Sequence, residues 1–97
     1  MHWYDAPDVT RRPFLVLTRP EACEILNQLL AAPITRTIRG IPTEVLLTRA
    51  DGMPSECVVS VDNITTITPA FCTRHIATLD ATRMREVCEA IGHAIDC

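Results

Sequence analysis

Residues 33–47 read PITRTIRGIPTEVLL, two apolar segments that flank a turn. Gly40 and Pro42 are typical turn residues, so we predict an antiparallel hairpin with strands over Pro33–Ile38 and Thr43–Thr48. An ordinary strand pair has solvating side chains beside its turn, whereas this one has two arginines and threonine hydroxyls. The stretch therefore predicts a strand pair and suggests that the polar groups beside the turn bind something.

Further strands and two helices are predicted on either side of the hairpin. Apolar runs and alternation predict strands over Pro13–Thr18, Cys57–Ile67 and Arg74–Thr78, and apolar residues at helical spacing predict helices over about Arg19–Leu30 and after Asp80. Short strands with one closing helix indicate a mostly β fold with helices (α+β), a small, strongly bent antiparallel sheet or partly open barrel. We treat residues 1–97 as one domain.

Local signals refine these elements. Thr18–Glu21 fits a capping box with proline in the first turn of the first helix, and Asp80 is a typical cap for the C-terminal helix. The apolar face of that helix is expected to comprise Met84, Val87, Cys88, Ile91 and Ile95. In the strand after Cys57 the alternation slips, which predicts a bulge or bend at Asp62–Asn63.

Composition restricts the class of protein. The chain has 97 residues, a net charge of −3, no apolar run long enough for a membrane span and no secretory signal, so we expect a cytoplasmic protein. Its five cysteines form no CxxC pair, which favours free thiols over a disulfide framework. Net acidity argues against loose binding of nucleic acid, but all nine basic residues are arginines, whose guanidinium groups suit phosphates.

The arginines suggest a site for an anionic group. Arg11 and Arg12 precede the first long strand, Arg36 and Arg39 lie in or near the predicted turn, and Thr35 lies beside them. If these ends of the sheet meet, arginine and hydroxyl donors could stabilise a phosphoryl-transfer transition state without a metal. On spacing alone, a solvated rim of arginines is the simpler interpretation. The Cys72/His75 and Cys88/His93 pairs do not add up to a zinc site, and we expect His75 to be a hydrogen-bonded structural residue.

Five blocks of sequence resemble the MazF/PemK family of toxin endoribonucleases in order and spacing. They are RRPFLVL at 11–17, APIT at 32–35, IPTEV at 41–45, VDNITTI at 61–67 and IATLD at 76–80. The resemblance implies a type II toxin with an SH3-like barrel, a homodimer and no cofactor or metal. It further implies sequence-specific cleavage of single-stranded RNA by attack of the ribose 2′-hydroxyl, leaving 2′,3′-cyclic phosphate and 5′-hydroxyl ends and inhibiting translation and growth.

The resemblance also implies roles for particular residues. Arg12 would bind the phosphate and take part in proton transfer, and Thr35 would stabilise the transition state. Because the pKa of arginine is about 12 or higher, an electrostatic role for Arg12 is easier to defend than that of a general base. Asp62 and Asn63 correspond to an acidic-Gln pair that contacts bases, with Asn one methylene shorter. The alternative is that these two are turn residues that bond their own backbone.

Three more basic residues are expected to contact RNA, namely Arg11, Arg36 and Arg39, and the last two would steer its backbone toward Thr35. The chain departs from the family pattern at its start, where Met1–Thr10 replaces a full strand and a Gly-Ser-Glu-rich loop. The substrate loop is therefore shortened or rebuilt, in which case Tyr4–Thr10 would alter RNA specificity. Trp3 and Tyr4 are expected to pack as the remnant of the first strand, with stacking on bases as the alternative.

The expected partners are single-stranded RNA and a cognate antitoxin whose disordered C-terminal segment blocks the RNA groove. Two other interpretations remain open. A non-catalytic CcdB-type toxin would bind DNA gyrase, but that class depends on a C-terminal Trp-Gly-Ile and this chain ends in AIDC. A degenerate toxin would keep antitoxin binding without turnover, which the presence of Arg12 and Thr35 argues against.

Overall fold

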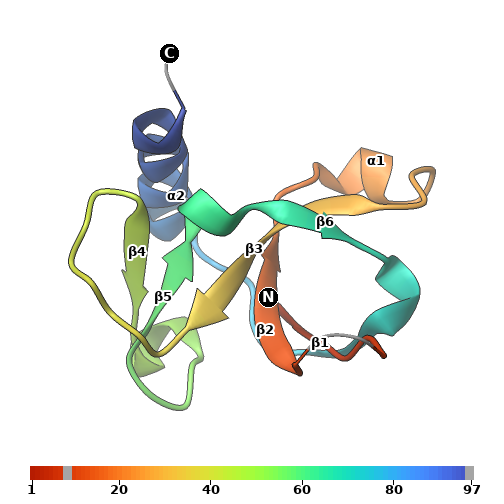
Figure 1. Ribbon diagram of the computed structural model, residues 1–97, viewed down its shortest axis with the longest axis horizontal. Helices are drawn as coiled ribbons and strands as arrows, with labels where there is room; N and C mark the ends of the chain where they lie inside the picture. The colour runs from red at the N-terminus through yellow and green to blue at the C-terminus, as the bar shows by residue number, and fades with distance from the viewer. Residues whose placement is uncertain (8–9, 96–97) are drawn as a thin grey trace.

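The computed structural model describes residues 1–7 and 10–95 of the chain. Its strands form one antiparallel sheet with a long C-terminal helix (Figure 1). The strands are β1 (His2–Tyr4), β2 (Arg12–Val16), β3 (Leu29–Thr35), β4 (Glu44–Leu47), β5 (Cys57–Ser60), β6 (Thr65–Ile67) and β7 (Cys72–His75). The helices are α1 (Pro20–Cys23) and α2 (Ala81–Ala94), and short 3₁₀ turns cover Arg49–Asp51 (η1), Val61–Asn63 (η2) and Pro69–Phe71 (η3).

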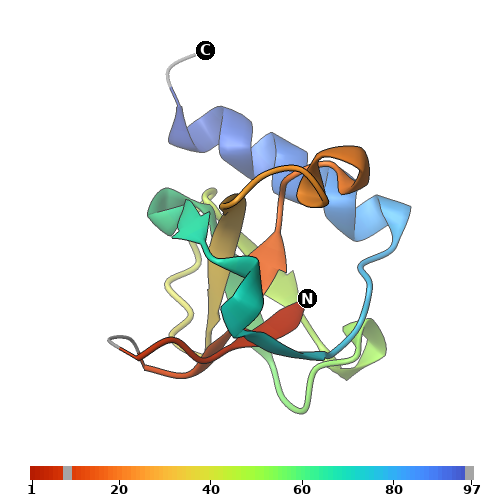
Figure 2. The same cartoon turned by 90° about the vertical axis from the view of Figure 1, so that its right-hand side faces the viewer.

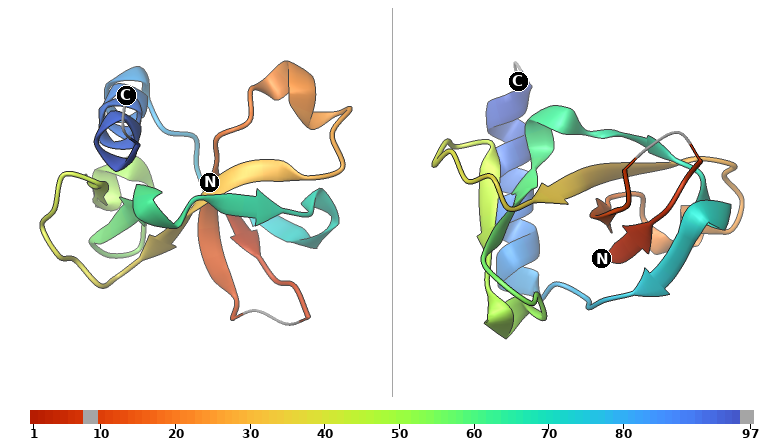
Figure 3. Two further views of the ribbon diagram at one scale, coloured as in Figure 1. Left: turned by 45° about the horizontal axis from the view of Figure 1, so that its top comes forward. Right: turned by 60° about the horizontal axis from the view of Figure 1, so that its bottom comes forward.

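Strand β3 is the centre of the sheet. The strand order is β4-β5-β3-β2-β1-β7, with β6 paired to the first half of β3. Figure 3 shows β3 running between two halves of the molecule, one with β4, β5 and α2 and the other with β1, β2, β6 and α1. The buried side chains form two clusters, a larger one at α2, β4 and β5 that also includes Met1 and Leu15, and a smaller one around Tyr4 and Phe14. Within the described residues no pairing joins β4 to β7, so the predicted partly open, strongly bent antiparallel fold is confirmed as an open sheet.

Helix α2 lies across the strands at one end of the molecule (Figure 2). Asp80 caps it as predicted, because its Oδ1 accepts a hydrogen bond of 2.8 Å from the backbone N–H of Arg83. Val87 and Ala90 are buried against the sheet. Cys88 and Ile95, which the apolar pattern assigned to the buried face, are exposed.

The predicted hairpin is wrong, although both of its strands exist. Strand β5 lies between β3 and β4, and Val59 is paired with Ile34 on one side and with Val45 on the other. All four residues of β5 are buried. A wholly buried strand is most stable with neighbours on both edges, and the stretch 36–43 is long enough to reach past it to the outer edge of the sheet.

The predicted helix over Arg19–Leu30 is also wrong beyond its first turn. Helix α1 ends at Cys23, and Ile25 is 78% exposed although the helical pattern placed it on the buried face. Thr18 does not cap the helix; its hydroxyl accepts a hydrogen bond of 2.8 Å from the backbone N–H of Leu30. The residues from Leu29 onward instead join the central strand, where tertiary pairing outweighs weak helix propensity.

The predicted strand over Cys57–Ile67 is broken where the alternation slips. Strands β5 and β6 are separated by η2, which contains both Asp62 and Asn63. The two strands pair with opposite ends of β3, β5 with Ile34 and β6 with Leu29. The break predicted at this point is confirmed, and it takes the form of a 3₁₀ turn.

The N-terminal strand exists as the short β1, and Tyr4 packs in the core as expected, whereas Trp3 is half-buried. Tyr4 is 8% exposed, and its hydroxyl accepts a hydrogen bond of 3.1 Å from the backbone N–H of Thr68. The predicted last strand is shifted, since β7 covers Cys72–His75 instead of residues 74–78. His75 contacts the Thr78 hydroxyl at 3.2 Å.

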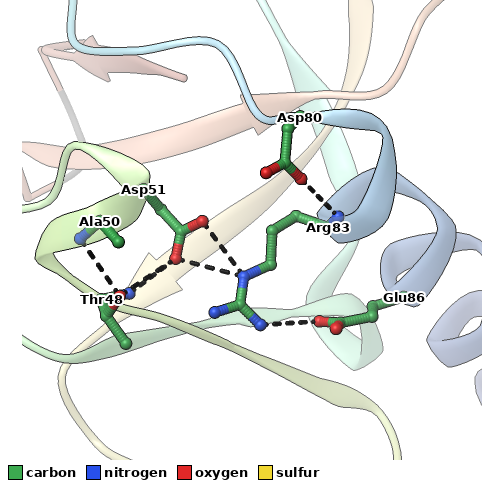
Figure 4. Close-up of polar contacts among 6 residues, drawn as sticks. All are labelled: Thr48, Ala50, Asp51, Asp80, Arg83 and Glu86. Carbon is green, nitrogen blue, oxygen red and sulfur yellow. Dashed lines mark hydrogen bonds and ion pairs between the residues drawn. The ribbon is translucent and has the colours of Figure 1, made fainter.

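A polar network joins η1 to α2 (Figure 4). Arg83 Nε donates to both carboxylate oxygens of Asp51, at 3.1 and 3.2 Å, and Arg83 Nη1 donates to Glu86 at 3.0 Å. The same carboxylate caps η1, because it accepts a hydrogen bond of 2.9 Å from the backbone N–H of Thr48. Gly52 follows at a φ of +92°, where a Cβ atom would lie 2.6 Å from Ala77 Cβ.

The expectations of free thiols and of no membrane-spanning segment can be compared with the structure for the described residues. Cys23, Cys57, Cys72 and Cys88 are free thiols, and Cys97 lies outside the described residues. None of the helices in residues 1–7 and 10–95 has the length and apolarity that a membrane crossing requires.

Candidate functional site

A cavity of about 500 Å³ opens on one face of β2 and β3, and we name it the threonine cavity. It brings together four residues that the sequence predicted, Arg12, Thr35, Arg39 and Asn63. The sheet register explains the pairing of the first two, because Phe14 lies opposite Pro33 and continuing that register places Arg12 opposite Thr35. Phe14 and Pro33 also line the cavity.

Four further polar residues line the threonine cavity that the sequence analysis missed, namely Thr10, Thr37, Ser60 and Thr65. One of them has a sequence signal. Thr37 follows Thr35 by two residues, the interval that returns a side chain to the same face of an extended chain. Ser60 has no such signal, since its place depends on the turn between β5 and β6.

Hydrogen bonds within the threonine cavity orient two of the predicted residues. The Thr35 hydroxyl oxygen accepts a hydrogen bond of 3.2 Å from the backbone N–H of Thr37. Because a hydroxyl is both donor and acceptor, its hydrogen is still available for an oxygen of a ligand. The Asn63 amide nitrogen donates to the Oγ atom of buried Ser60 at 2.8 Å, which leaves the amide oxygen and one N–H for other contacts.

Glu44 organises the loop that places Arg39 at the cavity. Its Oε1 accepts hydrogen bonds from the backbone N–H groups of Arg39, at 2.8 Å, and Gly40, at 3.0 Å. Its Oε2 lies 3.9 Å from Arg39 Nη1 and has no hydrogen-bond partner among the described residues. The Glu44 side chain is only 3% exposed. The sequence analysis did not identify Glu44 as part of a polar site, because its position under the loop depends on the folded sheet.

The charge of the threonine cavity is positive. Of the described residues that line it, Arg12 and Arg39 are the ionisable ones, and the remaining polar groups are hydroxyls and one amide. Arg12 has no carboxylate within 4.0 Å in the described part of the chain, whereas Arg39 is close to Glu44. Such a set of donors favours a ligand with several anionic oxygens, and Arg12 is the guanidinium free to bind it.

The structure does not bring Arg11, Arg36 or Asp62 into the threonine cavity. Arg36 follows Thr35 directly, so strand alternation turns it to the other face of the sheet. Arg11 is turned away from Arg12 in the same manner, and its guanidinium carbon lies 4.5 Å from the centre of the Trp3 ring. Asp62 is exposed and accepts a hydrogen bond from the Thr43 hydroxyl.

Arg36 instead lines a second and larger cavity of about 680 Å³, which we name the arginine cavity because Arg49 and Arg74 line it as well. The larger of the two cavities is therefore not the one that contains Arg12. Cys57 also lines it, and burial raises the pKa of the Cys57 thiol, so this group is a neutral thiol near neutral pH.

No metal-binding cluster is evident in residues 1–7 and 10–95, because no three His, Cys, Asp or Glu side chains gather closely enough there to hold an ion.

Comparisons with known proteins agree with this geometry. Residues 5–95 match the family described as PemK-like, MazF-like toxin of type II toxin–antitoxin system. The chain is 35% identical over 96 residues to a protein of Mycobacterium tuberculosis named probable endoribonuclease MazF5, which covers 98% of this chain and 88% of that protein.

Solved structures with the same fold include toxins and a toxin complex. The Mycobacterium tuberculosis toxin MazF-mt6 superposes with a TM-score of 0.87 at 37% identity, covering 97% of this chain and 95% of that one. A MazE–MazF crystal structure from Deinococcus radiodurans superposes with a TM-score of 0.78 at 25% identity, covering 95% and 87%. Both likenesses extend over nearly the whole chain.

Proposed function

The chain belongs to the family of PemK-like, MazF-like toxins of type II toxin–antitoxin systems, and we propose that it is an endoribonuclease that cuts single-stranded RNA without a metal ion. The observation that best supports this function is the threonine cavity, in which Arg12, Thr35 and Asn63 meet. The similarity to a protein named endoribonuclease favours this function over the gyrase-binding alternative. Cleavage of cellular RNA would inhibit translation and growth, and it would take place in the cytoplasm.

The proposed reaction is an internal transesterification. The ribose 2′-oxygen forms a bond to the adjacent phosphorus while the bond from phosphorus to the 5′-oxygen of the next nucleotide breaks. The proton of the 2′-hydroxyl is given up to solvent, and the leaving 5′-oxygen takes one up, so the products are a 2′,3′-cyclic phosphate and a 5′-hydroxyl end. No water is consumed, and the transition state has extra negative charge on the phosphoryl oxygens.

Arg12 and Thr35 would stabilise that negative charge. The Arg12 guanidinium, which has no carboxylate within 4.0 Å among the described residues, can bind two phosphoryl oxygens, and the Thr35 hydroxyl has its hydrogen available for a third. Arg12 acts through charge, since a guanidinium holds its proton too firmly to serve as a general base. Arg39 adds positive charge at the rim, reduced by its contact with Glu44.

Asn63 would read a base next to the scissile phosphate. Its amide is oriented by Ser60, and a fixed amide presents one acceptor and one donor to the exposed edge of an unstacked base. Asp62 lies outside the cavity lining and is bonded to Thr43, so a role in base contact would require that bond to break. We therefore assign the base contact to Asn63.

A homodimer and an antitoxin complete the proposal. The likeness to a MazE–MazF structure supports a partner protein of this kind for the present chain. A disordered acidic C-terminal segment of the antitoxin could fold onto the basic RNA groove and exclude the substrate. Two copies of the chain would extend the groove across both subunits.

The test is cleavage of total cellular RNA by the purified protein in excess EDTA, with mapping of new 5′-hydroxyl ends. We expect ends that cluster at one short sequence. Arg12→Ala should reduce the cleavage rate by a factor of about 10² to 10³, the usual cost of removing one preorganised donor. Arg85→Ala is the matched control, because Arg85 is an exposed arginine on α2 that lines neither cavity.

Three results would contradict the proposal. If the wild-type protein produces no new 5′-hydroxyl ends, it is not a ribonuclease of this type. If EDTA abolishes cleavage, the reaction needs a metal. If Arg12→Ala cleaves as fast as Arg85→Ala, Arg12 has no part in the chemistry.

A further inference from the structure

The arginine cavity has the composition of a binding site for an anion with an apolar part. Three guanidinium groups line it, those of Arg36, Arg49 and Arg74, and no acidic residue does so in the described chain. Its apolar lining includes the buried side chains of Ile34 and Met53. A basic concavity of this kind is unexpected in a chain whose net charge is −3.

These three arginines differ from the arginines with structural roles. Arg83 forms ion pairs with Asp51 and Glu86. By contrast, no carboxylate within residues 1–7 and 10–95 lies within 4.0 Å of Arg36, Arg49 or Arg74. Three unneutralised positive charges around one cavity repel each other, so a polyanionic ligand would be stabilised there.

The two cavities adjoin at one residue of β3. Thr35, the last residue of β3, lines both of them. Because β3 ends at Thr35, a chain molecule whose reacting phosphate lies there can pass around the end of the strand to Arg36 on the other face. Trp3 forms part of the wall of the arginine cavity, and Arg11 lies over its ring, which adds a fourth guanidinium near the rim.

We propose that the arginine cavity is a second RNA subsite, which binds nucleotides that flank the scissile phosphate. Phosphates of the flanking segment contact Arg36, Arg49 and Arg74, and one base packs against the apolar lining and Trp3. The subsite rests on the proposed ribonuclease function, since it extends the substrate path from Thr35. Its effect is on affinity and salt dependence, and the chemistry stays in the threonine cavity.

The test compares two double variants that lose the same charge. Arg49→Ala/Arg74→Ala removes two guanidinium groups from the cavity, and Arg19→Ala/Arg85→Ala removes two exposed ones elsewhere. Binding of a labelled RNA of about 12 nucleotides, with deoxyribose at the mapped cleavage site, is measured by fluorescence anisotropy over a range of salt concentrations. If no cleavage site is found, a mixed-sequence RNA of the same length is used.

We expect the cavity variant to raise the Kd roughly tenfold at about 0.1 M salt, relative to the control variant. Its plot of log Kd against log salt should be less steep by about 1.4, because each phosphate contact with single-stranded nucleic acid contributes about 0.7 to the slope. Cleavage of a trinucleotide that spans only the scissile bond should be the same for both variants. The far-UV spectrum of each variant verifies its fold.

The outcomes separate this inference from the proposed function. If the two double variants bind RNA with equal affinity while the wild-type protein cleaves RNA, the subsite proposal is wrong and the proposed ribonuclease function is unaffected. If the wild-type protein does not cleave RNA but the cavity variant loses RNA affinity, the result supports the subsite and contradicts the proposed ribonuclease function. If RNA binding is unchanged but binding of a polyglutamate peptide is lost, the cavity is a peptide site and the inference is wrong.

Discussion

The polar network between η1 and α2 allows a quantitative prediction of how much Asp51 and Arg83 together contribute to the free energy of unfolding. The Asp51 side chain is 8% exposed and that of Arg83 is 26% exposed, so the two hydrogen bonds between them are mostly shielded from water. Hydrogen bonds to charged groups contribute about 1.5–3 kcal/mol each, and desolvation of a partly buried pair offsets part of that gain. We therefore expect a coupling free energy of about 2 kcal/mol between the two side chains at pH 7.

The pH dependence of this coupling has a definite sign. Burial by itself would raise the pKa of Asp51, but the backbone N–H of Thr48 and the guanidinium of Arg83 outweigh it and lower the pKa below 3.8, its ordinary value. The unfolded chain thus binds the proton more tightly than the folded one. The stabilisation is complete above pH 3.8 and is lost as the pH falls below it through the folded-state pKa.

A double-mutant cycle measures the coupling. Asp51→Asn, which keeps an acceptor for Thr48, is combined with Arg83→Ala, and the free energies of unfolding in urea are compared at one protein concentration. Pairing Asp51→Asn with Arg85→Ala provides the control cycle, for which we expect coupling near zero. A coupling equal to that of the control, or one that is the same at pH 7 and about pH 2, would refute the assigned network.

Three further substitutions test the fold and the site. Gly52→Ala should destabilise the protein by roughly 1–2 kcal/mol more than Gly40→Ala, because both residues have positive φ but only the first lacks room for a Cβ atom; equal urea midpoints would contradict this. Tyr4→Phe should cost about 1 kcal/mol by leaving the Thr68 N–H unpaired, and wild-type thermal stability would exclude that role. Glu44→Ala should raise the KM for RNA with little change in overall stability, since it releases a surface loop next to the cavity; an unchanged KM would remove Glu44 as a positioning residue.

Features set by neighbouring residues in the chain were predictable. Asp80 as the cap of α2, the broken alternation at Asp62–Asn63 and the apolar strand β2 each follow from local hydrogen bonding or from side-chain periodicity. Arg12 and Thr35 emerged as site candidates because their residue types suit phosphate chemistry and their blocks match a family.

Features set by strand pairing were not predictable from the chain. Ile25 and Leu26 have helical spacing, yet they are exposed because the central strand begins a few residues later. The turn after β3 resembled a hairpin because turn chemistry is local, whereas the insertion of β5 between the two strands depends on the whole sheet. The place of Glu44 under the loop depends on the same insertion.

By itself the sequence determined which residue types were present for phosphate chemistry, and where the chain turns. The tertiary structure decided which of them meet. Arg11 and Arg12, and likewise Thr35 and Arg36, are adjacent in sequence, but an extended chain alternates the directions of its side chains. The register of β2 against β3 then brings Arg12 to Thr35 on one face and leaves Arg36 on the other, with Arg49 and Arg74, because pairing distant strands is a property of the folded sheet.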